Sequence, residues 1–229
     1  MSRKHLLDTT SFSILIPARA GSKRIPNKNI VTLAGKPLIE YTIETSLEAT
    51  KSVYVSTDCP DIKRICSRYK DVVVVDRPSQ LAEDDSTTNS VIEHFLENYE
   101  VETFALVQAT SPLLKAAHIR NALIKLEDES YDTVLSGYKT VQFYWSLAGT
   151  PLNFDPLSKK RTQDIDDWLV ENGALYATNR RSFYKNNNLI GDKVGIIAMS
   201  KIDSVDIDDY EDLEMAESTI LYRKRKNNK

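Results

Sequence analysis

The amino-acid sequence predicts a three-layer α/β fold with a mostly parallel sheet, and three observations support this prediction. Short apolar runs alternate with stretches of helical spacing along most of the chain. The run at 72–75 is four consecutive valines, as expected for a strand covered on both faces. Polar segments follow three of the runs directly, at 17–29, 56–58 and 108–112. Sheets of this kind bind ligands beyond the carboxyl ends of their strands.

The predicted elements follow one another regularly through the first 136 residues. Strands are expected where short apolar runs are bounded by polar or turn residues, at 13–17, 53–56, 72–75, 104–107 and 133–136. Helices are expected where apolar residues recur every three or four positions, at 37–49, from Asp58 or Asp61 to Tyr69, at 88–99 and at 118–127. The alternation of the two kinds of element predicts helices on both faces of the sheet.

The alternation of strands and helices breaks between Gly137 and Leu169, a segment rich in aromatic, proline and charged residues. We interpret 138–171 as an inserted lobe within a single domain that spans residues 1–229. Strands are expected again at 174–177 and 195–199, and a helix at 208–222. The basic residues after this helix are expected to form a solvated tail.

Composition and charge exclude several classes of protein. The chain has 229 residues, of which 41% are hydrophobic, enough to form a sizeable core. The formal net charge of −3 creates no field that would recruit nucleic acid or a membrane surface, and no apolar run approaches the roughly 18–20 residues that span a bilayer. The two cysteines, Cys59 and Cys66, are too few for a disulfide framework. We therefore expect a soluble, cytoplasmic protein without a nucleic-acid or membrane partner.

The segment 17–29 carries the clearest chemical signal. Four cations, Arg19, Lys23, Arg24 and Lys28, surround a turn at Gly21 directly after the first predicted strand. Such a turn lets backbone N–H groups point at an anion, and the cations add charge-assisted bonds to phosphate oxygens. The spacing matches neither a Walker A loop nor a dinucleotide fingerprint. A triphosphate cradle is favoured over an ordinary exposed basic loop.

The same loop resembles the signature of the CMP-N-acylneuraminate synthetases, the cytidylyltransferases that activate sialic acid and related sugars. Five further segments resemble motifs of that family in the same order, at 55–58, 77–84, 106–113, 172–176 and 206–213. Six ordered matches are far more specific than any one of them. The resemblance implies a Rossmann-like nucleotide-binding topology of the nucleotide-diphospho-sugar transferase type, and a homodimer formed through the inserted lobe.

The resemblance also implies a reaction. The anomeric hydroxyl of a nonulosonic keto-sugar acid attacks the α-phosphorus of CTP in line, giving a CMP-sugar and pyrophosphate. Candidate nucleotide-binding residues are Arg19, Ala20, Gly21, Ser22, Lys23, Lys28, Asn29, Thr57 and Asp58. Thr57 and Asp58 could face the base or ribose, while Asp58 could instead cap the next helix. Arg24 stands where the family often has glycine.

Asp206 and Asp208 are the candidate metal ligands and, with Arg19 and Lys28, the candidate catalytic residues. Side chains at i and i+2 of an extended segment share a face, and two carboxylates favour a hard cation such as Mg²⁺. The alternative is that these residues belong to an acidic helix start, in which Asp208 only caps the C-terminal helix.

Candidate sugar-binding residues follow from the resemblance. They are Gln108, Arg161, Gln163, Asn172 and Tyr176. Gln108 could instead satisfy the turn that follows its strand, and residues 86–90 could line the sugar pocket or cap a helix. A second family arginine is replaced at 169–171 by Leu, Val and Glu, which leaves the choice of acid open.

Two alternatives to the main interpretation remain. The first is a CTP-dependent synthetase for a legionaminic, pseudaminic or Kdo-type acid, although the segment 172–176 favours the nine-carbon acids over Kdo. The second is a non-catalytic nucleotide-binding regulatory module, which would bind CTP without releasing pyrophosphate. The paired aspartates argue against a pure binder, because binding alone has less need of a second metal ligand.

Overall fold

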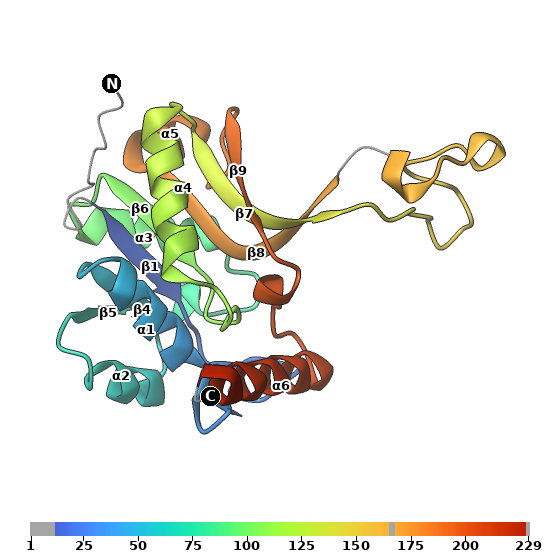
Figure 1. Ribbon diagram of the computed structural model, residues 1–229. Coiled ribbons are helices and arrows are strands. Elements are labelled where there is room, and N and C mark those ends of the chain that lie inside the picture. The colour runs from blue at the N-terminus through green and yellow to red at the C-terminus, as the bar shows by residue number, and fades with distance from the viewer. Residues whose placement is uncertain (1–11, 165–167, 228–229) are drawn as a thin grey trace.

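The computed structural model describes residues 12–164 and 168–227, and its α/β architecture confirms the predicted fold class (Figure 1). Seven strands form one sheet in the order β5-β4-β1-β6-β8-β7-β9. Four parallel strands form its first half: β1 Ser13–Pro17, β4 Val53–Thr57, β5 Val72–Asp76 and β6 Thr103–Val107. The other half contains β7 Thr133–Thr140, β8 Trp168–Asn179 and β9 Val194–Met199.

Helices cover both faces of the sheet, because alternate side chains of each strand point to opposite sides. Ile14 and Ile16 of β1 pack in one cluster with α1 Leu38–Ala49, α2 Pro60–Cys66 and α4 Ala116–Asp128. Leu15 packs in a second cluster with α3 Thr88–Asn98 and α5 Arg180–Asn186. These two clusters form the outer interfaces of a three-layer domain.

A third apolar cluster lies beyond the carboxyl ends of the parallel strands. It joins α6 Tyr210–Asn227 to the small hairpin of β2 Thr32–Leu33 and β3 Lys36–Pro37, and includes Ile25 of the basic loop. Figure 1 shows α6 lying across this end of the sheet. The C-terminal helix therefore packs against the segment that follows the loop 17–29. Within the described ranges, no helix combines the length and apolarity that a membrane crossing needs.

The second half of the sheet differs from the parallel arrangement. β8 runs antiparallel to β6 and to β7, while β7 and β9 are parallel. The strand expected at 174–177 is the inner part of this twelve-residue strand. Helix α5 and the β2–β3 hairpin were not predicted from the sequence.

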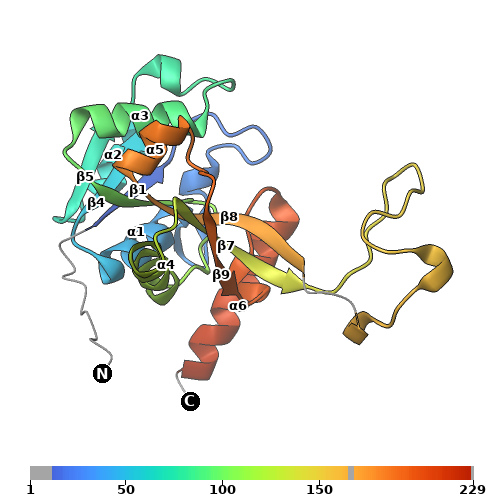
Figure 2. The same cartoon turned by 90° about the horizontal axis from the view of Figure 1, so that it is seen from above.

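The predicted lobe, 138–171, contains the outer ends of β7 and β8 together with the segment between them. Figures 1 and 2 show this segment projecting away from the body of the domain. Among its described residues, the ring of Phe154 contacts the rings of both Phe143 and Trp145. Several large apolar side chains remain exposed on it: Val141, Trp145, Leu147, Leu152 and Leu157.

Candidate active site

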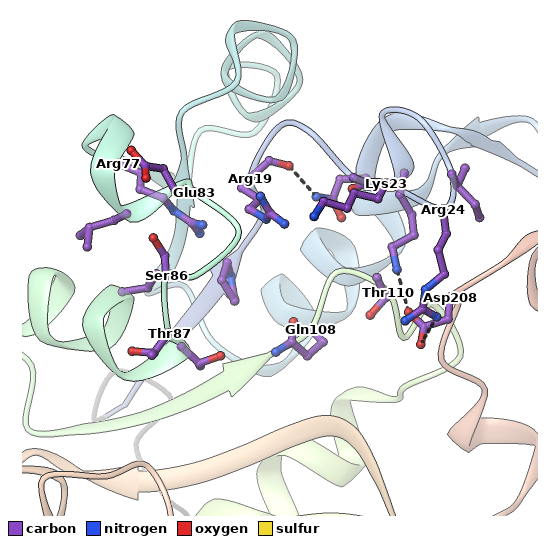
Figure 3. A pocket seen from close by; sticks show the side chains of 18 residues that line it. Arg19, Lys23, Arg24, Arg77, Glu83, Ser86, Thr87, Gln108, Thr110 and Asp208 are labelled. Carbon is purple, nitrogen blue, oxygen red and sulfur yellow. Dashed lines mark hydrogen bonds and ion pairs between the residues drawn. The ribbon is translucent and has the colours of Figure 1, made fainter.

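A cavity of about 390 Å³ opens beyond the carboxyl ends of β1 and β6 (Figure 3). One wall is the basic loop, the opposite wall is the segment from Arg77 to Val91, and Gln108 and Thr110 contribute the floor. This is the position at which an open α/β sheet presents its ligand site. The predicted loop residues that line the cavity are Arg19, Ser22, Lys23, Lys28 and Asn29.

At the N-terminal end of the loop, two cations share one carboxylate. Arg19 donates to Asp84 at 2.7 Å and to the carbonyl oxygen of Ala82 at 3.0 Å, and Lys23 lies 2.6 Å from the same Asp84 carboxylate. Hydrogen bonds from Lys23 and then from Arg19 hold the pKa of Asp84 below its usual range. Sequence reasoning had given Asp84 no role, although it ends a motif at 77–84 that the resemblance includes.

At the C-terminal end of the loop, the other two cations meet Asp208. Lys28 donates to the carbonyl oxygen of Ile207 at 2.7 Å and to Asp208 at 3.1 Å, and Arg24 lies 2.9 Å from Asp208. Burial pushes the pKa of Asp208 upward, but the hydrogen bonds from Lys28 and Arg24 outweigh burial and lower it. The Lys28 side chain is 16% exposed, against 73% for Lys23.

The side chains of Asp58 and Asn29 hold the turn between the two cation pairs. Gly21 has a φ of +75°, which favours glycine. The backbone N–H of Ala20 donates to Asp58 at 2.9 Å, and Asn29 donates to the carbonyl oxygen of Arg19 at 3.0 Å. Asp58 therefore fixes the loop, and the alternative that it caps α2 is wrong: Cys59 is the N-cap residue.

Ala20, Gly21, Thr57 and Asp58 are predicted nucleotide-binding residues that lie outside the residues lining the cavity. The Thr57 side chain is fully buried, and its hydroxyl accepts a hydrogen bond from the backbone of Cys59 at 3.1 Å. These four residues shape the loop and its support. All four belong to matched motifs, yet they lie outside the cavity lining. A motif match alone therefore does not distinguish residues that line the cavity from residues that support the loop.

Arg77 lines the cavity and was missed as a site residue. Its Nε donates to the Ser56 hydroxyl at 3.1 Å and its Nη2 to the Ser56 carbonyl oxygen at 2.8 Å, so β4 fixes its plane. Burial lowers the pKa of Arg77 to about 10. The signal that could have found it is a charged residue directly after a β-strand, at the end of the sheet that binds ligands.

The wall opposite the loop contains residues 86–90, which the sequence suggested could either line the sugar pocket or cap a helix. Ser86, Thr87 and Thr88 all line the cavity. Thr87 is also the N-cap of α3, and its hydroxyl accepts from the backbone N–H of Ser90 at 3.1 Å. Lining and capping therefore both apply. Gln108 reaches the cavity with its side chain (Figure 3), while its backbone N–H donates to Ala174 in β8 at 3.1 Å.

Asp206 and Asp208 lie in the extended segment before α6 but line different cavities. Asp208 faces the loop cations, whereas Asp206 lines a neighbouring cavity of about 430 Å³ together with Tyr138 and Asp212. Burial raises the pKa of Asp206, against a hydrogen bond from Thr110, and the charge of Asp208 raises it further. The alternative that Asp208 caps α6 is wrong, because Asp209 accepts the N–H groups of Glu211 and Asp212.

The carboxylates have the chemistry that a magnesium ion needs. Among the described residues, no group of three or more His, Cys, Asp or Glu could hold a metal by itself. Mg²⁺, however, is commonly held by one or two carboxylates, with substrate phosphates and water as its other ligands. The buried Oδ1 of Asp206 has no hydrogen-bond partner in the described part of the chain, so this oxygen is available to a cation.

The predicted sugar-binding residues do not all meet at the cavity. Arg161 and Gln163 are exposed on the projecting segment. The Tyr176 hydroxyl donates to Glu171, and burial followed by this interaction raises the pKa of Tyr176. Asn172 is 8% exposed, and its amide is hydrogen-bonded inside the protein.

Comparison with known proteins agrees with this geometry. The sequence matches the cytidylyltransferase family over residues 13–228. The chain belongs to the cytidylyltransferase family. The N-acylneuraminate cytidylyltransferase of Oncorhynchus mykiss is 36% identical over 217 residues, which are 90% of this chain and 50% of that protein.

A second curated protein and a solved structure are also similar to this chain. The pseudaminic acid cytidylyltransferase of Campylobacter jejuni is 28% identical over 222 residues, 91% of this chain and 95% of that one. A solved structure of a CMP:2-keto-3-deoxy-manno-octonic acid synthetase in complex with CTP superposes with a TM-score of 0.70 at 17% identity, covering 93% of this chain and all of that chain. This cytidylyltransferase chain thus spans about half the length of the N-acylneuraminate relatives.

Proposed function

We propose that the protein transfers CMP from CTP to a nonulosonic, sialic acid-like keto-sugar acid and releases pyrophosphate. One observation carries the proposal: Arg19 and Lys23 meet an anion, the Asp84 carboxylate, at the mouth of a cavity beyond the strand ends. These cations are positioned for negatively charged oxygens, and a triphosphate presents many of them. Membership of the cytidylyltransferase family supports cytidine as the nucleoside.

In the proposed reaction the protein mainly positions groups and neutralises charge. The anomeric hydroxyl attacks the α-phosphorus, a new C–O–P link forms, and the bond to the pyrophosphate oxygen breaks in line. The hydroxyl proton passes to a base or to solvent, and the pyrophosphate leaves with the bonding pair. Arg19 and Lys23 stabilise the charge that develops on the phosphoryl oxygens, and Arg77 adds a fixed guanidinium on the opposite wall.

A magnesium ion fits the proposed chemistry. Asp206, through its unpartnered oxygen, and Asp208 would hold it. A metal ion held by these carboxylates would supply Lewis-acid chemistry, which would neutralise phosphate charge and lower the pKa of the attacking hydroxyl. Lys28 and Arg24 keep Asp208 ionised at neutral pH, because their hydrogen bonds favour the charged carboxylate.

The sugar acid would lie beside Gln108, between the loop and β8. Arg161 and Gln163 sit on the projecting segment, so we propose that they act at the site of a second copy within a homodimer. The exposed Trp145, Leu147 and Leu152 support this arrangement, since apolar side chains gathered on one projection are typical of association surfaces. We place the enzyme in the cytoplasm, which suits two cysteines that are both free and buried.

Pyrophosphate release tests the proposal. The purified chain is incubated with CTP, a panel of keto-sugar acids and Mg²⁺, each omitted in turn, and the CMP-sugar is identified by mass spectrometry. Release that requires all three components is the expected result. Release with no acid of the panel, although CTP binds, would favour the non-catalytic regulatory module instead.

A pseudaminic-type acid is the second candidate substrate. It is supported by the similarity to the Campylobacter pseudaminic acid cytidylyltransferase, which is 28% identical to this chain over 222 residues. It is also consistent with Leu169, Val170 and Glu171, which occupy the stretch where the resemblance calls for a second arginine. Competition among N-acylneuraminic, legionaminic, pseudaminic and Kdo acids in the same assay ranks the candidates by kcat/KM.

A further inference from the structure

A wide bulge separates the two ends of β8. Leu135 of β7 pairs with Tyr176, whereas Gly137 pairs with Glu171, so the single residue Ser136 faces the four residues 172–175. Gly173 in this bulge has a φ of +69°, which a side chain would strain. Bulges of this kind re-aim the strand on either side of them. The bulge is joined to the cavity through Gln108, which lines the cavity and donates its backbone N–H to the carbonyl oxygen of Ala174.

The Asn172 amide occupies the centre of the bulge, and its hydrogen-bonding capacity is used inside the protein. Its Oδ1 accepts from the Ser136 hydroxyl at 2.7 Å and from the backbone N–H of Ala174 at 3.2 Å. Its Nδ2 donates to the Ser204 hydroxyl at 2.9 Å and contacts the Met199 sulfur at 3.4 Å. An amide offers two acceptor and two donor positions, and all four are occupied here.

These bonds link the two parts of the site that the proposed reaction needs together. On one side, the bulge presents the Ala174 carbonyl oxygen, which accepts the backbone N–H of Gln108. On the other side, Ser204 ends the short helix η5 Ile202–Ser204, two residues before Asp206. The segment is fixed again just beyond, where the backbone N–H of Ile207 donates to Thr110 at 2.9 Å.

The helix η5 has a second polar attachment that makes it a firm base. Asp203 is 3% exposed and lies 2.6 Å from both Lys115, before α4, and Arg223, in α6. Burial raises the pKa of Asp203, but hydrogen bonds from Lys115 and Arg223 hold it below its usual range. The connection from Asn172 to Ser204 therefore reaches a rigid support, and it can transmit the position of the bulge to the carboxylates.

We propose that Asn172 is a positioning residue, which holds Asp206 and Gln108 in register through Ser204 and the bulge instead of binding the sugar itself. This inference rests on the proposed cytidylyl transfer and adds a residue role to it. Removing the amide leaves the Ser204 and Ser136 hydroxyls with only their backbone partners, the carbonyl oxygens of Ser200 and Leu175, and the segment before Asp206 loses its side-chain bond to β8. A displacement of about 1 Å between reacting groups can cost roughly 100-fold in rate.

The experiment is a double-mutant cycle on Asn172→Ala and Ser204→Ala, with kcat and the KM for each substrate measured for all four proteins. We expect each single variant to lose about 10- to 100-fold in kcat, while the KM for CTP stays within about twofold of the wild-type value. The kcat of the double variant should be no lower than that of the less active single variant, because both substitutions break the same link. The unchanged KM for CTP shows that each variant is folded, since the loop lies on the other side of the cavity.

Ser182→Ala is the matched control. Ser182 lies in α5, outside the residues that line the cavity, and is buried to a similar degree as Ser204. Its hydroxyl contacts Asp132 at 3.3 Å. It should keep the wild-type kcat. Direct sugar binding by Asn172 predicts instead a raised KM for the sugar acid in Asn172→Ala and a normal Ser204→Ala, and that result would overturn the inference.

Amide hydrogen exchange separates failure of the inference from failure of the proposed function. If the wild-type protein releases no pyrophosphate, the proposed function fails, yet exchange at residues 203–208 still reports the link. Faster exchange there in both variants, with unchanged exchange in the loop, supports the positioning role. Exchange at the wild-type rate in both variants would contradict the positioning role of Asn172.

Discussion

Each end of the basic loop pairs two cations with one aspartate, but the two pairings differ in their exposure and in their attachment to the fold. At one end Arg19 and Lys23 share Asp84, which is half-exposed and stands on a separate segment before α3. At the other end Lys28 and Arg24 share Asp208, and Lys28 also donates to the Ile207 backbone. Lys28, whose side chain is mostly covered, is built into the fold, while the exposed Lys23 can exchange its carboxylate for another anion. One end of the loop is therefore an anchor, and the other is the proposed phosphate contact.

The largest expected effect concerns the exchangeable end. Arg19→Ala should lower kcat/KM for CTP about 100-fold or more, because a positioned donor to the charged transition state is lost. The melting temperature should change little, since the side chain is about one-third exposed. Steady-state kinetics and calorimetry measure the two quantities. Arg64→Ala, at an exposed ion pair on α2, is the control. A large loss of stability in Arg19→Ala would remove the distinction between the two ends.

The second prediction concerns Asp206, the buried carboxylate beside the anchor. Burial raises the native pKa of Asp206 above its unfolded value of about 3.9, so its contribution to stability is greatest below that value and falls as pH rises through the native pKa. Asp206→Asn should therefore raise the melting temperature at pH 7 in chelator, with a smaller gain at pH 4. Its turnover with Mg²⁺ should fall about 100-fold. A variant that is less stable at pH 7 would contradict the account.

The third prediction tests the anchor directly. Lys28→Met leaves the Ile207 carbonyl oxygen without its donor and removes one of the two cations that meet Asp208, which should cost about 1–3 kcal/mol of unfolding free energy. Urea unfolding measures this loss, and activity should fall with it. Lys63→Met, at the more exposed ion pair with Asp76, should cost less. Equal costs at Lys28 and Lys63 would mean that the anchor adds nothing to stability.

The smallest effect is expected at Asp84. Asp84→Asn removes the carboxylate that competes with the triphosphate for Arg19 and Lys23, so the KM for CTP should fall about two- to fivefold. The kcat should stay close to the wild-type value, and Asp85→Asn is the neighbouring control. Isothermal titration with CTP checks the change. An increase in KM would show that Asp84 holds the cations in place for the nucleotide, rather than competing with it.

The parallel half of the fold was predictable because each of its signals is local. The valine run of β5 and the apolar spacing of α1 and α3 lie within single short windows of sequence. Helix α5 escaped because 180–186 has few apolar residues. Its signals were Asn179, which caps the N-terminus, and Asn187, which ends the helix in a left-handed conformation.

The sequence predicted which segment forms the site, but not which partner each of its residues would contact. The motif located the loop, yet it could not say that Asp58 would support the loop from behind, while Asp84 would reach its cations from 65 positions further along the chain than Arg19. Pairings over such distances depend on how the chain returns in three dimensions. The full length and antiparallel direction of β8 could not be predicted either. A bulge interrupts the alternation of apolar and polar residues by which a strand is recognised in a sequence.

The bond from Lys28 to the Ile207 carbonyl oxygen joins positions 179 apart in sequence. Contacts of such long range form late in folding, because the intervening chain must first be ordered. The basic loop therefore takes its final arrangement only when β1 and the segment before α6 have come together. A change far along the chain, at the segment before α6, can thus disturb a loop that stands directly after the first described strand.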